Sequence, residues 1–250
     1  MSAALRVEAL KLLRSPVGAI TSLAVVMGTV LLLAGITAGL RADNPDLMAQ
    51  LGPAAATNWA GLLSSAAQIT SVGGLLGAGV VLTWLMAREF TDGTISALFA
   101  LPVSTGRIAA AKLVIFGLWS VAVSIALVIA VLALGLVLGY GAPNPEMQAA
   151  VGRQTLLILL SAMLATPAAW VATLTRSVLA GVGTVIGLIT IAQVGALTGA
   201  GPWIPFAAPA LWAMSDGAAV SAVQLSLSIA TGLVFAVLTV VVWSRLQLNR

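Results

Sequence analysis

Residues 113–140 read LVIFGLWSVAVSIALVIAVLALGLVLGY, an apolar run without one charged side chain. A helix needs about 20 such residues to cross the hydrocarbon core of a bilayer. The 250-residue chain has the same character throughout, since apolar residues make up 60% of it and charged residues 7%. A soluble domain carries about 25% charged residues, because its surface faces water. The sequence therefore predicts an all-α membrane protein and excludes a soluble globular domain.

Five further segments are long and apolar enough to cross a bilayer, which brings the number of predicted spans to six. The predicted spans are residues 17–40, 59–87, 113–140, 155–175, 177–197 and 220–243. Together they form one transmembrane domain that covers residues 1–250. An even number of spans places both termini on the same side of the membrane.

The basic residues indicate which side that is. If the termini are cytoplasmic, nine Lys and Arg residues lie inside and two lie outside, as the positive-inside rule requires. Those inside are Arg6, Lys11, Arg14, Arg88, Arg107, Lys112, Arg176, Arg245 and Arg250, and those outside are Arg41 and Arg153. An excess of Arg over Lys amid abundant Ala, Gly and Leu is typical of a GC-rich bacterial genome. We expect a multi-pass protein of the cytoplasmic (inner) membrane of a bacterium.

Several classes of chemistry are disfavoured by what the sequence lacks. It contains no Cys and no His, which removes thiolate and imidazole metal ligands and the usual general base. The interiors of the predicted spans carry no Asp, Glu, Lys or Arg, which argues against a proton-coupled transporter and an intramembrane hydrolase. No G-x-x-x-x-G-K-[ST] phosphate loop is present. The net charge of +4 indicates asymmetry across a bilayer rather than a nucleic-acid partner. We predict a non-catalytic chain that binds no cofactor or metal itself.

Residues 88–107 read REFTDGTISALFALPVSTGR and connect the second and third predicted spans. We expect the second span to end in water at Glu89. Thr91-Asp92-Gly93 predicts a turn, because Gly adopts backbone angles that other residues resist. Thr94 is then placed to cap a short helix that stops before Pro102. We interpret this segment as a docking element at the cytoplasmic face, and a plain connecting loop is the alternative.

The same segment resembles the cytoplasmic signature of ABC-2-type transporter permeases. The signature has a Glu-Phe pair, then Gly-Thr, an apolar pair, Pro-Val-Ser and two basic residues. The matching positions are Glu89, Phe90, Gly93, Thr94, Leu98, Phe99, Pro102, Val103, Ser104, Arg107 and Lys112. The opening Glu8-x-x-Lys11-Leu12-x-Arg14-Ser15 is similar to the N-terminal stretch of that family. Six spans with both ends inside also fit.

The resemblance implies a permease subunit of an ATP-binding cassette exporter. Such a subunit pairs with a second permease chain, as a homo- or heterodimer, and with two copies of a separate nucleotide-binding ATPase that holds ATP and Mg. The segment 88–107 would dock into that ATPase, and the short connection after the fourth span would touch it. The implied ATPase-coupling residues are Glu89, Phe90, Gly93, Thr94, Leu98, Pro102, Arg107 and Arg176. The expected cargo is a drug, an antibiotic or another amphipathic compound moved outward. The alternative is a membrane protein without ATP coupling, such as a channel subunit or a membrane assembly factor.

Two segments outside the spans have apolar faces of their own. Residues 2–15 predict an amphipathic helix that lies along the inner leaflet, with a plain basic flank as the alternative. Its expected apolar arc is Leu5, Ala9, Leu12 and Leu13, opposite Glu8, Lys11 and Arg14. Residues 198–219 are too apolar for a solvated loop and contain too many prolines to span. We expect them to form a re-entrant outer segment, with a Trp-anchored surface loop as the alternative.

A polar stripe runs along the second predicted span. Ser64, Gln68 and Ser71 are spaced at i, i+4 and i+7, and Gln193 stands alone in the fifth span. Such side chains more commonly hydrogen-bond a neighbouring helix. The alternative is that these four residues line a substrate path.

Overall fold

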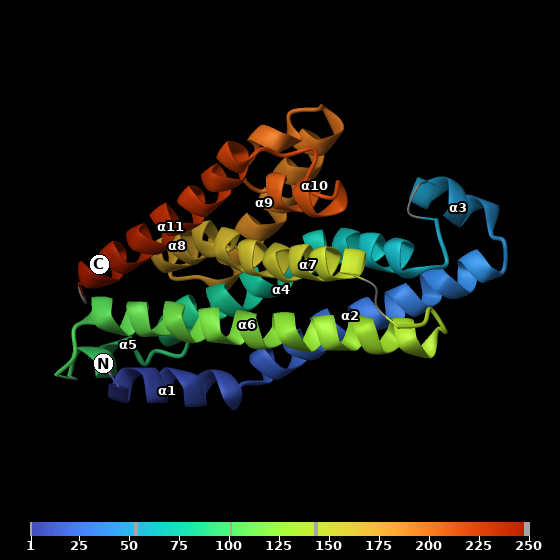
Figure 1. Cartoon of the computed structure of the whole chain (residues 1–250). Coiled ribbons are helices and arrows are strands. Elements are labelled where there is room, and N and C mark those ends of the chain that lie inside the picture. Colours follow the sequence, from blue (N-terminus) through green and yellow to red (C-terminus); the bar gives the residue numbers. More distant parts are fainter. Residues whose placement is uncertain (1, 53–54, 101, 143–144, 248–250) are drawn as a thin grey trace.

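The computed structural model describes residues 2–52, 55–100, 102–142 and 145–247, and every regular element in these ranges is helical (Figure 1). The helices are α1 (Ser2–Leu13), α2 (Pro16–Arg41), α3 (Pro45–Leu51), α4 (Trp59–Thr91), α5 (Ile95–Phe99), α6 (Thr105–Val137), α7 (Pro145–Leu164), α8 (Thr166–Thr175), α9 (Val178–Leu197), the 3-10 turn η2 (Gly201–Trp203), α10 (Ala208–Met214) and α11 (Ala222–Ser244).

Six helical segments are long and apolar enough to cross a membrane, namely α2, α4, α6, α7 together with α8, α9 and α11. The predicted all-α fold with six candidate spans is confirmed. The helices extend beyond some of the predicted spans, since α6 begins at Thr105 and α7 begins at Pro145. The fourth candidate span is interrupted at Ala165, because Pro167 has no backbone N–H to continue the helical ladder.

The first and last helices bring both ends of the chain to one end of the bundle. Figure 1 shows the start of α1 and the C-terminal end of α11 at the same end of the bundle, on the left, as an even number of spans requires. Arg250, one of the nine basic residues assigned to the inside, lies outside the described residues.

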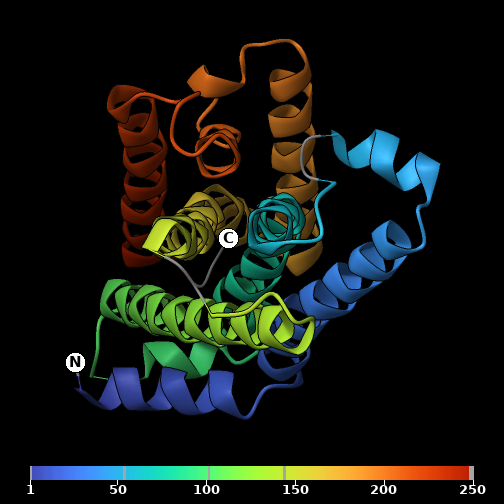
Figure 2. The same ribbon diagram turned by 45° about the vertical axis from the view of Figure 1, so that its right-hand side comes forward.

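Helix α4 is the central element of the bundle. It packs against α2, α6, α7, α8, α9 and α10, and Figure 2 shows it enclosed between these helices. Small residues allow the close approach. A Cβ added at Gly79 would collide with the Val185 side chain of α9, and one at Gly181 would collide with Thr83 of α4. The sequence therefore brings α4 and α9 together through two glycines on opposite helices.

Local signals fix both ends of α4. At its start, the Asn58 side chain accepts a hydrogen bond from the Gly61 N–H at 3.0 Å, which caps the helix. At its end, Gly93 adopts a φ of +68°, a left-handed conformation that glycine tolerates without steric cost. The predicted turn at Thr91-Asp92-Gly93 is present, and the short helix α5 follows it.

Two short helices occupy the connections at the other end of the bundle. The polar run after α2 forms α3, which the sequence did not indicate and which Asn44 caps through the Asp46 and Leu47 N–H groups. Residues 198–219 form η2 and α10, and α10 packs on α4 and α7. The Ser228 hydroxyl of α11 donates to the Pro205 carbonyl at 2.8 Å, which ties this segment to the last helix.

Candidate functional site

Four charged side chains from three helices meet at the end of the bundle that carries α1 and α5. They are Glu8 and Lys11 of α1, Glu89 of α4 and Lys112 of α6, here called the four-charge cluster. The Lys112 Nζ lies 2.8 Å from Glu8 Oε2 and 2.7 Å from Glu89 Oε1. The Lys11 Nζ lies 2.6 Å from Glu8 Oε1 and 3.0 Å from Glu89 Oε1. Each ammonium group therefore bridges both carboxylates.

The cluster is buried. Lys112 is fully buried, Glu8 and Glu89 are each 2% exposed, and Lys11 lies at the edge. Burial alone would lower the pKa of the Lys11 ammonium, but its hydrogen bond to Glu8 and the charges of both carboxylates raise the pKa above its usual value. The second oxygen of Glu89, Oε2, is buried and has no hydrogen-bond partner among the described residues. Because an unpaired charge here would be very costly, the cluster holds α1, α4 and α6 in one arrangement.

Trp243 of α11 extends this connection to two more helices. Its buried ring lies 5.6 Å from Lys112 Nζ and 5.7 Å from the Phe90 ring centroid. Its indole N–H donates to the Thr173 hydroxyl of α8 at 3.2 Å. Its carbonyl accepts a hydrogen bond from the Thr105 hydroxyl at 2.6 Å. The five helices α1, α4, α6, α8 and α11 are therefore connected at this end. A displacement of one of them would change the contacts of the other four.

An exposed surface lies directly beside the cluster. In α5, Ile95 and Leu98 pack against the core while Phe99 remains 37% exposed. The other exposed members of this surface are Gly93, Thr94, Pro102 and Arg107, and we call the five residues the coupling surface. Aromatic and Arg side chains are enriched at protein interfaces, and this surface exposes one of each.

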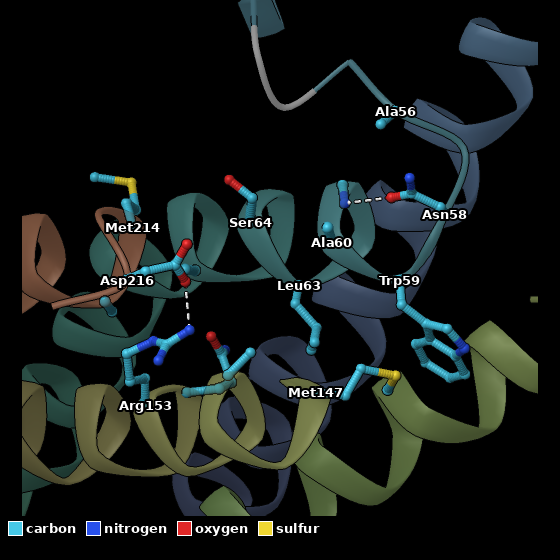
Figure 3. A pocket seen from close by; sticks show the side chains of 15 residues that line it. Ala56, Asn58, Trp59, Ala60, Leu63, Ser64, Met147, Arg153, Met214 and Asp216 are labelled. Atoms are coloured by element: carbon cyan, nitrogen blue, oxygen red, sulfur yellow. Dashed lines mark hydrogen bonds and ion pairs between the residues drawn. The ribbon is translucent and has the colours of Figure 1, made fainter. Parts of the chain in front are cut away.

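The opposite end of α4 borders a cavity of about 580 Å³. Its walls come from the first turns of α4, from α7, from the last two residues of α10 and from Asp216 (Figure 3). Figure 3 shows Arg153 and Asp216 joined at one end and Trp59 beside Met147 at the other. Trp59 also packs edge-to-face on Tyr140, with ring centroids 5.9 Å apart. The molecule thus has two distinctive polar regions, one at each end of α4.

Comparison with protein families matches residues 4–193 to the ABC-2 family transporter protein. This match covers more than half of the chain. The chain belongs to the ABC-2 transporter family. No curated protein matches it. The matched range begins in α1 and ends in α9, so it contains the whole four-charge cluster, the coupling surface and the start of α4. The resemblance indicated by the 88–107 segment is confirmed, and the chain is the membrane component of a transporter.

Two expectations about charged residues in this permease are wrong. Glu89 does not end α4 in water but is buried against two ammonium groups. In α1, Leu5, Ala9 and Leu12 of the predicted apolar arc pack against the core, but Glu8 of the predicted polar face is buried and Leu13 is 79% exposed. The reason is the same in both cases. Lys112 enters from α6, far along the chain, and its buried charge attracts both carboxylates to the inner face.

The structure brings some of the implied coupling residues together and leaves others apart. The Arg176 guanidinium lies 5.6 Å from the Phe90 ring, although the two residues belong to different connections. Arg176 has a φ of +55° at the end of α8. Thr94 occupies the cap position of α5, but its side chain makes no capping hydrogen bond. Glu89 is buried in the four-charge cluster and is not part of the exposed coupling surface.

The four candidate pathway residues of the permease do not form one continuous stripe. Ser64 borders the 580 Å³ cavity, whereas Ser71 and Gln193 border a small cavity of about 50 Å³ between α4, α9 and α10. Gln68 is exposed on α4. The Ser71 hydroxyl donates to the Gln68 carbonyl of its own helix at 2.7 Å. Within the described ranges, none of the four side chains hydrogen-bonds a neighbouring helix.

An uncharged interhelical hydrogen bond of α4 comes from a residue that the sequence analysis did not select. The Gln154 amide of α7 donates to the Thr70 hydroxyl at 2.7 Å, and both side chains are buried. Gln154 lies directly before the predicted fourth span (residues 155–175), and no signal in the sequence set it apart. Its importance depends on α7 starting ten residues earlier than the apolar run indicates.

Proposed function

We propose that this permease is the membrane subunit of an ATP-binding cassette exporter in the cytoplasmic membrane of a bacterium. The observation that carries the proposal is the four-charge cluster, which ties α1, α4 and α6 together directly beneath the exposed coupling surface. Membership of the ABC-2 family supports association with an ATP-binding subunit. A membrane protein without an ATPase partner would have no evident need for the four-charge cluster next to the exposed coupling surface.

The proposed topology has both termini in the cytoplasm. It is supported by the nine-to-two division of basic residues and by the position of α1 and α11 at one end of the bundle. The outward face of α1 presents Val7, Leu10 and Leu13 beside the cations Arg6 and Arg14. Apolar and basic side chains on one face suit a helix that lies at an anionic leaflet. At the other end, the short, proline-rich η2 and α10 suit a re-entrant outer segment whose backbone the bundle covers.

Coupling follows from the arrangement of the cluster. A nucleotide-binding subunit seated on Phe99 and Arg107 would displace α5 when it binds or hydrolyses ATP. Because Gly93 and the buried end of α4 connect α5 to the cluster, the displacement reaches α4, α6 and α1 together. Arg176, stacked on Phe90, gives the same subunit a second point of contact. ATP and Mg belong to the partner, and this chain acts as the non-catalytic component.

The assembly we propose contains two permease chains, identical or different, and two ATPase subunits. The cargo class is a drug, antibiotic or other amphipathic compound moved outward. Ser64, Gln68, Ser71 and Gln193 are the proposed pathway-lining residues, because they are polar and lie on or near exposed parts of α4 and α9.

Co-purification tests the proposal. The permease is co-expressed with a candidate nucleotide-binding subunit from the same genome, and the complex is reconstituted into vesicles. We expect the parent to retain the ATPase and to drive ATP-dependent transport, whereas Phe99→Asp loses both. Leu197→Asp, an exposed apolar position at the far end of α9, is the matched control and retains the ATPase. ATP hydrolysis by the permease alone, or transport without any ATPase, would favour a membrane protein without ATP coupling.

A further inference from the structure

The cavity at the start of α4 contains buried polar atoms that the fold leaves unused. Among the described residues, three side-chain atoms around it are buried without a hydrogen-bond partner. They are Trp59 Nε1 and Arg153 Nε, which are donors, and Gln154 Oε1, which is an acceptor. Buried polar groups in proteins are nearly always hydrogen-bonded, so three exceptions around one cavity indicate groups arranged for a ligand.

The orientation of the Gln154 amide is fixed by its neighbour. The Thr70 hydroxyl donates its hydrogen to the Ala66 carbonyl, so its oxygen can only accept from Gln154. The amide nitrogen must therefore face Thr70, which leaves Oε1 as the free acceptor. Gln154 is 3% exposed, and its free oxygen belongs to the cavity wall rather than to solvent.

The charged residues of the described lining are Arg153 and Asp216, which form an ion pair with each other. Asp216 is 85% exposed, and an ion pair with so exposed a partner contributes little to stability. A ligand that carries both an anion and a cation can replace this contact with two of its own. A ligand with a single charge satisfies one partner and leaves the other unpaired.

The remaining wall is apolar. Leu63, Ala67, Met147 and Met214 line the cavity together with the Trp59 ring. A volume of about 580 Å³ lies within the range of small-molecule sites. The cavity therefore offers an apolar body, two hydrogen-bond donors, one buried acceptor and a charge of each sign.

We propose that this cavity binds a zwitterionic amphiphile, in which an anionic group and an ammonium lie a few atoms apart on an apolar chain. The anion accepts hydrogen bonds from the Arg153 guanidinium, and the apolar chain extends along the cavity toward the Trp59 ring at its other end. The ammonium donates to the Asp216 carboxylate and to Gln154 Oε1. The inference deepens the proposed function, because it rests on the topology that places this end of α4 at the outer leaflet, where such a ligand would leave or enter.

Equilibrium binding to the purified full-length permease in detergent micelles tests the assignment. The probe is radiolabelled lysophosphatidylethanolamine, displaced by lysophosphatidylglycerol, by a long-chain alkylamine or by glycerophosphoethanolamine. The first two competitors carry an anion or a cation on a comparable chain, and the last is the free headgroup. We expect the zwitterionic lipid to bind about tenfold more tightly than either singly charged competitor, as one extra charged hydrogen bond provides.

Two cavity variants and one control complete the experiment. Arg153→Gln should lose affinity for the probe, and Asp216→Asn should abolish the preference over lysophosphatidylglycerol. Asn tolerates the φ of +53° at residue 216, so the second variant keeps its backbone. Arg41→Gln is the control, because Arg41 lies at the same end and its guanidinium bonds the Leu138 carbonyl at 2.7 Å.

Three results would overturn the inference. They are parental binding by both cavity variants, an equal loss in Arg41→Gln, and displacement by the free headgroup as effective as by the lipid. Binding is measured without the ATPase, so its failure leaves the proposed exporter function standing. Failure of the co-purification experiment would likewise leave the binding result intact.

Discussion

Removal of the Glu89 carboxylate should destabilise the folded chain strongly. Glu89→Ala leaves Lys112 fully buried with Glu8 as its remaining counter-charge at 2.8 Å. Breaking a buried ion pair costs about 3–5 kcal/mol, because the surviving charge keeps its desolvation penalty. Since Lys112 retains one carboxylate, we expect the lower end, about 3 kcal/mol, which is roughly a hundredfold change in the unfolding equilibrium.

The assay is equilibrium unfolding of the purified chain in mixed micelles of increasing SDS content, followed by Trp fluorescence. Asp92→Ala is the matched control, because Asp92 is an exposed carboxylate one turn away that pairs loosely with Arg88 at 3.6 Å. Its change in unfolding free energy should stay within about 0.5 kcal/mol. If Glu89→Ala unfolds at the same SDS content as Asp92→Ala, the cluster does not hold these helices together.

A double variant separates the charge from the packing. Glu89→Met with Lys112→Met removes one charge of each sign and leaves Glu8 and Lys11 paired at 2.6 Å. Replacement of a buried ion pair by apolar side chains is often neutral or stabilising, so the double variant should recover most of the lost stability. If it remains as unstable as Glu89→Ala, lost packing rather than an unpaired charge is the cause.

Two further predictions concern the topology and the docking turn. The native chain has no Cys, so single cysteines at positions 43 and 216 should react with an impermeant thiol reagent outside intact cells, whereas one at position 92 should not. Labelling of residue 92 from outside would reverse the proposed orientation. Gly93→Val places a β-branched residue at a φ of +68°, which costs about 1–2 kcal/mol and misdirects α5. We expect weaker co-purification of the ATPase, with Gly183→Val, at an open position of α9, as the unaffected control.

The fold followed from the sequence where the information is local. The hydropathy of each of the six apolar segments predicts its transfer from water into lipid. This transfer depends on the composition of that segment alone. The turn at Gly93 depends on the backbone of one residue. The four-charge cluster could not be derived in this way, because Glu8 and Lys112 are 104 positions apart and charge alone indicates solvent exposure. The same holds for Gln154, whose partner Thr70 lies on another helix.

The two polar regions of the permease are connected by a single element. Helix α4 runs without interruption over 33 residues, which corresponds to about 50 Å, from Trp59 at the cavity to Glu89 in the cluster. Its neighbour, formed by α7 and α8, is broken at Ala165. The Thr166 hydroxyl at this break lies 2.8 Å from the Met163 carbonyl of α7 and 2.8 Å from the Gly232 carbonyl of α11. Helix α4 therefore moves as one rod, whereas the break allows α7 to move relative to α8.

Pro167→Ala tests whether this break serves transport. Alanine restores the backbone N–H that proline lacks, so α7 and α8 can join into one continuous helix. We expect the variant to retain its ATPase partner and its stability but to transport more slowly, because α7, which lines the cavity, would then move with α8 as one body. The measurement compares ATP hydrolysis with substrate transport in the same vesicles, since a loss of coupling lowers only the second. Pro209→Ala, in α10, controls for the loss of a buried proline elsewhere. Parental transport by Pro167→Ala would show that α4 transmits its motion without the break.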